Sequence, residues 1–257
     1  MKFKLLRLLK DCTSFISEEE ISERLNLSRQ TVFRYIDQLR EIGYDIQLIP
    51  HLGYKLVSCP DRLLPFEIQD RLNTKVIGKK IYHYDLIGST MDIAMKLALD
   101  RACEGAVVCA EGQIRGRGRL GREWISPKYK GVYFSLILRP EIPLNQAPII
   151  TLLTAVSICQ AINKMALVSA SIKWPNDILV NNKKIGGILT ELNSGSQIIH
   201  QMFHSHQVRS QMPLHTLQTL PFSQRNNENL RESQHICLVF VLKESEYLVL
   251  WIFPLLF

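Results

Sequence analysis

The pattern of hydrophobic and polar residues changes character near residue 65. Before that point, apolar residues at helical spacing predict three helices, at residues 3–10, 18–26 and 29–42. Two short apolar segments on either side of residues 51–53 then predict a hairpin, at 46–50 and 54–58. Three helices followed by a hairpin form the winged helix-turn-helix arrangement, so we expect a DNA-binding domain at residues 1–64.

The third predicted helix has two different faces. Val32, Ile36 and Leu39 follow one another at helical spacing and indicate the side that packs inward. Ser17, with Glu20 three residues later, predicts a capping box at the start of the second helix, and Ser28 an N-cap for the third. The polar residues that we expect to contact DNA, on the third helix and on the hairpin, are Ser28, Arg29, Gln30, Thr31, Arg34 and Lys55.

Strands and helices alternate after about residue 66. Strands are predicted at 106–112 and 132–139, a long apolar helix at 147–165, and three closely spaced strands at 171–174, 177–180 and 183–192. The pattern predicts a mixed α/β domain over residues 66–193, with a loop rich in Gly and Arg at 113–131. The fold class expected for the chain is therefore α+β.

The composition changes again after about residue 194. Every glycine lies at or before Gly195, and five of the seven histidines fall in the last 58 residues. Residues 197–235 show no sustained period of 2 or 3.6, and turns need Gly, Asp or Asn. We therefore leave residues 194–257 as an unassigned tail.

Charge and cysteine usage narrow the class of protein only slightly. The net charge of +7 and the pI of about 9.1 permit a nucleic-acid partner without establishing one. Ten Lys and Arg against nine Asp and Glu in residues 1–64 make that domain nearly neutral. The six cysteines are scattered and include no CxxC, so we expect neither a structural metal site nor a disulfide framework, but free thiols in a reducing cytoplasm. No run of 18 apolar residues predicts a membrane-spanning helix.

Residues 115–122 place four arginines and three glycines within eight positions. Glycines let backbone N–H groups approach an anion, and arginines add charge and forked donors, which suits a phosphate or a mixed anhydride. A solvated basic loop or an RNA-binding RG segment is the alternative interpretation.

A second motif, KWPND, occupies residues 173–177. Lys173 is able to neutralise a developing phosphate or carboxylate charge, while Asn176 and Asp177 offer oxygens to Mg²⁺. An Asn-Asp turn between two strands is an equally good interpretation. Lys184 precedes two glycines in a predicted strand, which indicates close approach of the backbone to a ligand.

These segments together resemble the family of bifunctional biotin–protein ligases and biotin-operon repressors. The motifs occur in the order GSTM (88–91), EGQIRGRGRLGREW (111–124), KWPND (173–177) and KKIGGILTEL (183–192), behind a helix-turn-helix. The resemblance covers residues 1 to about 193 and implies a catalytic domain similar to class II synthetases. It also implies a two-step reaction: biotin and MgATP form biotinyl-5′-adenylate, and a lysine of the biotin carboxyl carrier domain of acetyl-CoA carboxylase then attacks the acyl carbon.

The resemblance also implies roles for individual residues. Contacts to biotin or the adenylate are expected from Ser89, Thr90, Gln113, Arg117, Gly118, Arg119 and Lys184. Contacts to the nucleotide or Mg²⁺ are expected from Arg122, Asn176 and Asp177, and the catalytic residues implied are Lys173 and Arg119. Operator DNA is the second implied partner, and a homodimer is compatible with the resemblance.

Two departures from the family pattern keep alternatives open. Met91 stands where the family has Asn after Ser-Thr, and a GIGxN strand and a small C-terminal β-barrel are expected to be missing, as if the tail were unrelated sequence. The alternatives are a biotin-responsive DNA-binding regulator without turnover, a truncated ligase without turnover, and a lipoate–protein ligase. Because the missing pieces help to cover ATP in the family, we expect biotin binding to outlast ATP-dependent transfer.

Overall fold

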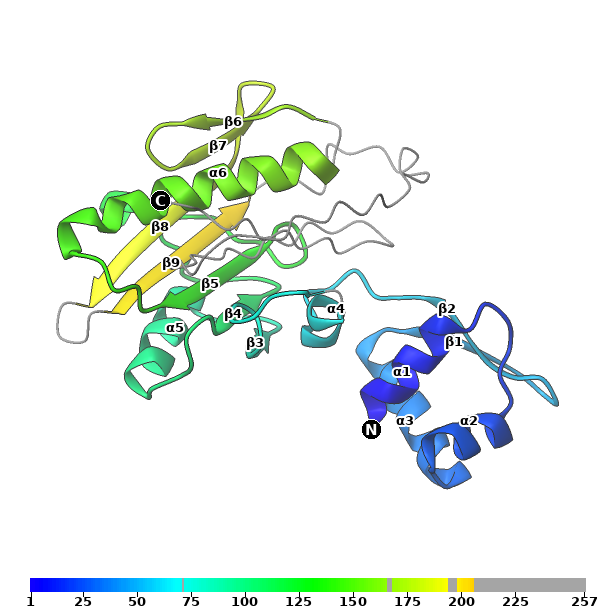
Figure 1. Cartoon of the computed structure of the whole chain (residues 1–257). Helices are drawn as coiled ribbons and strands as arrows, with labels where there is room; N and C mark the ends of the chain where they lie inside the picture. The colour runs from blue at the N-terminus through cyan, green and yellow to red at the C-terminus, as the bar shows by residue number, and fades with distance from the viewer. Residues whose placement is uncertain (71, 166–167, 194–197, 206–257) are drawn as a thin grey trace, which may run out of the picture. The chain divides into compact units, whose positions relative to one another are not determined.

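The structure is a computed structural model that describes residues 1–70, 72–165, 168–193 and 198–205 (Figure 1). The chain divides into two compact units, Met1–Arg62 and Leu63–Phe257, and each is described by itself. Expectations for residues 206–257, including the missing barrel, lie outside the described residues.

The N-terminal unit contains three helices and one hairpin. Its elements are α1 (Lys2–Asp11), α2 (Glu18–Leu25), α3 (Arg29–Ile42), β1 (Asp45–Ile49) and β2 (Gly53–Ser58). β1 and β2 are antiparallel, and the buried residues of α3 are Val32, Ile36 and Leu39, as their spacing predicted. The predicted winged helix-turn-helix arrangement is confirmed.

Side chains fix the ends of these helices. The backbone N–H of Glu20 donates to Ser17 Oγ over 3.1 Å, and that of Thr31 donates to Ser28 Oγ over 3.3 Å. Both serines are therefore N-caps. The side chain of Glu20 has a different partner: its carboxylate forms an exposed i,i+4 ion pair with Arg24 over 2.6 Å.

The C-terminal unit is built on a mixed sheet. Its strand order is β3-β4-β5-β9-β8-β7-β6, and only β3 and β4 run parallel to each other. The strands are β3 (Ile81–Tyr84), β4 (Val107–Ala110), β5 (Tyr133–Leu138), β6 (Ala170–Lys173), β7 (Asp177–Val180), β8 (Lys183–Asn193) and β9 (Ile198–Ser205). The helices are α4 (Pro65–Gln69), α5 (Thr90–Leu99) and α6 (Ala147–Met165), with short 3-10 turns η1 (Arg119–Gly121) and η2 (Leu144–Gln146).

Helices cover both faces of this sheet (Figure 1). Successive residues of β4 point to opposite faces, so Val107 and Val108 belong to different hydrophobic clusters. Val107 packs in the cluster that contains Ile158 of α6, whereas Val108 packs in the one that contains Ala94 of α5. The mixed α/β class expected for this unit is confirmed.

Helix α6 is an apolar core helix of this unit. Within the described residues it is the one helix long and apolar enough to cross a membrane by length and composition. Ile150, Ile158 and Ile162 are nevertheless buried in the cluster that covers the sheet. Packing in the core therefore accounts for its apolar sequence.

Strand β9 corrects the sequence analysis, which assigned no element after residue 193. Residues Ile198–Ser205 pair antiparallel with β5 on one side and with β8 on the other. A strand that is hydrogen-bonded along both edges is stabilised by its neighbours and needs no clear alternation of its own. Strand β3 and helix α4 also went unpredicted, because each spans only four or five residues.

Burial should make two cysteines unreactive. Desolvation raises the pKa of the Cys159 thiol to about 11, and burial together with nearby Glu111 raises that of Cys109 still further. Because the thiolate is the nucleophile, iodoacetamide at pH 8 should label exposed Cys103 in the folded protein and should label Cys109 and Cys159 only in urea. Mass spectrometry of the peptides measures this, and equal labelling of Cys103 and Cys109 without urea would contradict it.

Candidate functional site

The arginine-rich loop folds back on itself as a hairpin between β4 and β5. The N–H of Trp124 donates to the carbonyl of Gly116 over 2.9 Å, and the N–H of Gly118 donates to that of Arg122 over 2.7 Å. The turn η1 forms the tip. A Cβ on Gly116 would lie 2.3 Å from the Trp124 carbonyl oxygen, so the hairpin closes only with glycine there.

This geometry changes the physical role of the glycines. The sequence analysis attributed them to backbone N–H groups that approach an anion. In the structure, Gly116 makes room for the facing strand of the hairpin, and the N–H of Gly118 is already hydrogen-bonded within it. The closure of the hairpin therefore explains these two glycines without an anion.

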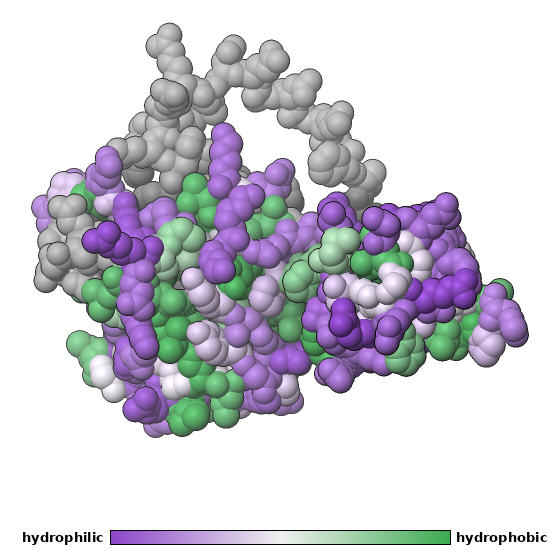
Figure 2. All heavy atoms as spheres, turned by 90° about the horizontal axis from the view of Figure 1, so that it is seen from below, coloured by the Kyte–Doolittle hydropathy of each residue, from purple (hydrophilic) through white to green (hydrophobic). Residues whose placement is uncertain are grey.

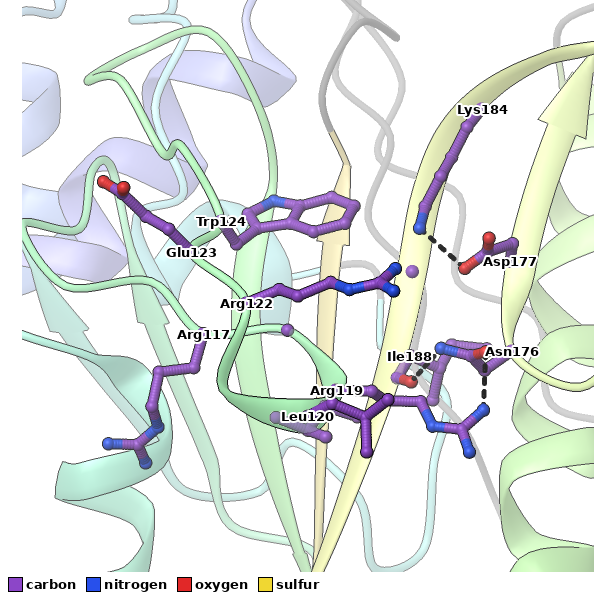
Figure 3. A pocket seen from close by; sticks show the side chains of 13 residues that line it. Arg117, Arg119, Leu120, Arg122, Glu123, Trp124, Asn176, Asp177, Lys184 and Ile188 are labelled. Carbon is purple, nitrogen blue, oxygen red and sulfur yellow. Dashed lines mark hydrogen bonds and ion pairs between the residues drawn. The ribbon is translucent and has the colours of Figure 1, made fainter.

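A pocket of about 360 Å³ lies between the tip of this hairpin and strands β7 and β8 (Figure 3). Four basic and two acidic residues line it, which favours an anionic ligand, and the volume suits a small molecule. The lining residues are Arg117, Gly118, Arg119, Leu120, Arg122, Glu123, Trp124, Asn176, Asp177, Lys184, Gly187, Ile188 and Leu189.

Asn176 holds the guanidinium of Arg119. Its Oδ1 accepts a hydrogen bond from Arg119 Nη1 over 3.1 Å. Its own position is fixed by Ile188 of β8, because Asn176 Nδ2 donates to the Ile188 carbonyl over 3.0 Å and Ile188 N–H donates to the Asn176 carbonyl over 2.9 Å. The arginine loop and the KWPND segment therefore meet at this point.

Lys184 and Trp124 form the opposite wall. Lys184 Nζ lies 2.7 Å from Asp177 Oδ1 and 5.0 Å from the centre of the Trp124 ring. A Cβ on Gly187 would lie 3.2 Å from the same ring, so the glycine lets the indole lie against β8. The side chains of Trp124, Arg122 and Lys184 are seen together in Figure 3.

Arg117 extends away from the other arginines. Its Nη1 lies 2.7 Å from Asp92 Oδ1 of α5 and its Nη2 lies 3.7 Å from Glu191 Oε2 of β8. In Figure 3 its guanidinium points away from those of Arg119 and Arg122. These exposed ion pairs connect the loop to two neighbouring elements, and neither acidic residue was identified from the sequence.

A buried polar cluster lies beneath the loop. Gln113 Oε1 accepts from the backbone N–H of Thr90 over 2.8 Å and from its hydroxyl over 3.1 Å. Gln113 Nε2 donates to Ser126 Oγ, and Ser135 Oγ donates to Thr90 Oγ1 over 2.9 Å. Thr90 and Gln113 are therefore brought together, and Ser126 and Ser135 are partners that the sequence analysis missed.

Ser89 is buried and serves as the N-cap of α5. Its Oγ accepts a hydrogen bond from the N–H of Met91 over 3.3 Å. The side chain of Met91 is fully buried as well. The methionine that departs from the family pattern thus packs inside the unit, directly after the capping residue.

Lys173 lies outside the set of residues that line the pocket. It is exposed at the end of β6, and its register partner across the strand pair is Asp177, which does line the pocket. The structure therefore brings Arg119, Arg122, Asn176, Asp177 and Lys184 together and leaves Lys173 at the edge.

The residues expected to contact DNA lie on the surface of the N-terminal unit. Hydrophilic side chains cover much of the face of this unit that Figure 2 shows at the right. Arg29 pairs with Glu19 over 2.9 Å, and Lys55 lies 5.8 Å from the Phe15 ring. The exposed residues are Ser28, Arg29, Gln30 and Arg34, and those partly exposed are Thr31 and Lys55.

Two families of domains match this chain. Residues 84–204 match the biotin/lipoate A/B protein ligase family, and residues 2–55 match a helix-turn-helix domain. The first match contains the whole pocket, and the second contains α3, β1 and the first three residues of β2. The chain is therefore similar to a helix-turn-helix domain over residues 2–55 and to the biotin/lipoate A/B protein ligase family over residues 84–204.

Curated relatives are named as both ligase and repressor. The chain is 44% identical over 180 residues to "Bifunctional ligase/repressor BirA" of Bacillus subtilis, and the aligned part is 70% of this chain and 55% of that protein. It is 34% identical over 191 residues to the protein of the same name from Salmonella typhimurium, and that alignment is 73% of this chain and 57% of the relative. The chain thus spans little more than half the length of these relatives.

Solved structures overlap with this chain only in part. The biotin protein ligase from Aquifex aeolicus in complex with biotin and ATP is 31% identical and covers 49% of this chain and 52% of its own, with a TM-score of 0.42.

Proposed function

We propose that this chain is a biotin–protein ligase, an ATP-dependent and AMP-forming enzyme that also represses transcription from a biotin operator. The pocket between the arginine loop and β8 carries the proposal, because it gathers cationic groups and an indole within a domain of the ligase family. The domain limits expected from the sequence are 1–64 and 66–193, and we propose that the second domain extends through β9, because this strand pairs with both β5 and β8.

Adenylation requires two anions to meet. The biotin carboxylate attacks the α-phosphate of ATP, an O–P bond forms, and pyrophosphate leaves with the electrons of the broken bond. Cationic groups that are already oriented lower the cost of this approach and stabilise the charge on the phosphate oxygens. Arg119, held by Asn176, and Arg122 and Lys184 on the facing wall supply such groups.

In the second step, a lysine amine of the carrier domain attacks the acyl carbon and AMP leaves. We assign biotin contacts to Ser89, Thr90, Gln113, Arg117, Gly118, Arg119 and Lys184, and nucleotide contacts to Arg122, Asn176 and Asp177. Lys173 is assigned to adenylation from the edge of the pocket, beside Asp177. The buried Thr90–Gln113 cluster keeps the floor of this site in one conformation.

The residues present suit a Mg²⁺ ion that arrives with ATP. No group of three or more His, Cys, Asp or Glu side chains that could hold a metal occurs among the described residues. Asp177 and Asn176 offer oxygens at the pocket, and both already contact cationic side chains. Mg²⁺ commonly takes one or two protein ligands and the rest from phosphates and water.

The test of ligase activity is pyrophosphate release with biotin and MgATP, measured beside direct biotin binding and beside label transfer to a biotin carboxyl carrier domain. Turnover should depend on biotin, with lipoate as the control substrate. Biotin binding without pyrophosphate release would contradict the ligase proposal in favour of a regulator or a truncated ligase without turnover. Turnover with lipoate but not with biotin would contradict the biotin–protein ligase proposal in favour of a lipoate–protein ligase.

We infer a cytoplasmic location, because ATP, the carrier domain and operator DNA meet there. A homodimer would place two copies of α3 on an operator with two half-sites, which is the usual arrangement for this motif. The partners we propose are therefore the biotin carboxyl carrier domain of acetyl-CoA carboxylase, operator DNA and a second copy of the chain.

Two substitutions in the N-terminal unit should separate base recognition from phosphate contact. Arg34→Ala should relax the base preference at one operator position, because an exposed arginine on α3 is suited to a guanine edge. Lys55→Ala should weaken binding to all sequences, and the slope of log binding constant against log salt concentration should become shallower by about one. Titration of operator and scrambled DNA at several salt concentrations distinguishes the two effects; identical behaviour of both variants would contradict the assignment.

A further inference from the structure

Helix α3 exposes an aromatic side chain on its polar face. Phe33 is 51% exposed and follows Gln30 by three positions, with Arg34 next to it. Residues three and four apart on a helix are neighbours on its surface, so Phe33 and Arg34 lie on either side of Gln30. The buried residues of the helix include Val32 and Ile36, and Phe33 lies where this buried stripe borders the polar face.

Phe33 is not accounted for by packing in the described part of the chain. The similarly exposed Phe3, at 50%, has the ammonium of Lys2 at 5.9 Å from its ring. Phe33 takes part in no ring or cation contact within the described residues. On the face that meets DNA in this class of domain, this half-exposed ring is suited to contact an apolar group on the DNA.

The charges of the N-terminal unit point in the same direction. Its basic and acidic residues nearly balance, and two basic residues of α3 are engaged in ion pairs, Arg29 with Glu19 and Arg40 with Asp37. Attraction to phosphates is therefore weak for a DNA-binding domain, so contacts to base edges must supply much of the preference. In the major groove, the one apolar group on a base edge is the C5 methyl of thymine.

We propose that Phe33 contacts the methyl groups of thymine in the operator and is a determinant of base preference. The proposal rests on the proposed DNA-binding function and deepens it. Gln30, which lies beside Phe33, suits an adenine, and Arg34, on the far side of Gln30, suits a guanine, so the three side chains together read a short sequence that includes thymine.

The experiment replaces thymine by deoxyuridine, which removes only the methyl group. An operator is first selected from random duplexes with the full chain in the presence of biotin and MgATP. Each thymine is then replaced in turn, and affinities are measured for the parent chain, Phe33→Ala and the control Phe3→Ala. At the contacted position the parent should lose about fourfold, the factor expected when one methyl group is no longer buried.

The variants decide whether Phe33 is the residue that senses the methyl group. Phe33→Ala should bind thymine and deoxyuridine operators equally, whereas Phe3→Ala should keep the fourfold ratio. Because Phe33 is half exposed, the circular dichroism spectrum and biotin binding of Phe33→Ala should match those of the parent, which excludes misfolding.

Different failures overturn different statements. A parent chain that selects no DNA overturns the proposed DNA-binding function itself. A parent that binds an operator but is insensitive to every deoxyuridine replacement overturns the role of Phe33, as does a Phe33→Ala variant that keeps the ratio. A Phe33→Ala variant that keeps the ratio but loses self-association in sedimentation assigns the ring to a contact between two copies of the chain instead.

Discussion

Replacing Arg119 by alanine is expected to shorten the lifetime of the bound biotinyl-5′-adenylate by about 10- to 100-fold. The guanidinium faces the pocket and is oriented by Asn176, which is itself fixed to β8. A charge-assisted hydrogen bond contributes about 1.5–3 kcal/mol, and its loss should appear mainly in the dissociation rate. The release of radiolabelled adenylate after dilution into unlabelled biotin and ATP measures it.

Arg115→Ala provides the matched control for this experiment. Arg115 belongs to the same loop and is exposed, but it does not line the pocket. Its removal lowers the charge of the loop by the same amount and should leave adenylate retention within about twofold of the parent, since exposed charges interact weakly. Equal losses in both variants would mean that general attraction, rather than the position of Arg119, retains the adenylate.

The elements that could be predicted from the sequence are those with local signals. Helix α6 was predicted at 147–165, where the structure has it, because its sequence is predominantly apolar over 19 residues. Helix α3 ends at Ile42 as predicted, and Gly43 follows it with a φ of 111°, a left-handed conformation that favours glycine. Strand β9 was not predictable in the same way, because it is stabilised by pairing on both edges, with β8 and with the distant strand β5, and not by a pattern of its own.

In the candidate site, too, the residues with a local sequence signal were predicted and those without one were not. Thr90 and Gln113 were assigned from motifs, and the structure places their side chains within hydrogen-bonding distance. Ser126 and Ser135 complete the cluster, but a single serine in a loop or strand has no local signal. For Lys173, the motif fixes its place in the chain, but its distance from the pocket depends on the fold, and in the structure it is exposed and is not among the lining residues.

Glu111 was overlooked because it follows an apolar strand. It is fully buried, and its Oε1 accepts hydrogen bonds from the backbone N–H of Leu63 over 2.7 Å and lies 3.0 Å from His83 Nε2. Its carbonyl accepts from the N–H of Tyr129 over 2.9 Å. One carboxylate residue therefore joins the first residue of the C-terminal unit, strand β3 and the far end of the arginine loop.

Glu111→Ala should consequently lower the free energy of unfolding of the C-terminal unit by at least about 1–3 kcal/mol. That is the cost of leaving one buried donor, here the N–H of Leu63, without its acceptor, and the cavity left by the side chain adds to it. Glu111→Gln keeps an oxygen at this position and should recover part of the loss. The exposed Glu141→Ala is the control and should stay within about 0.5 kcal/mol of the parent.

Urea unfolding followed by tryptophan fluorescence measures this stability selectively, because the N-terminal unit contains no tryptophan. Biotin should be absent, since a ligand that binds the folded state would mask the loss by mass action. An unchanged urea midpoint for Glu111→Ala would show that Leu63 and His83 find other partners or water. If the midpoint falls, biotin binding should weaken as well, because Gln113, which holds Thr90, lies only two residues beyond Glu111 on the same segment.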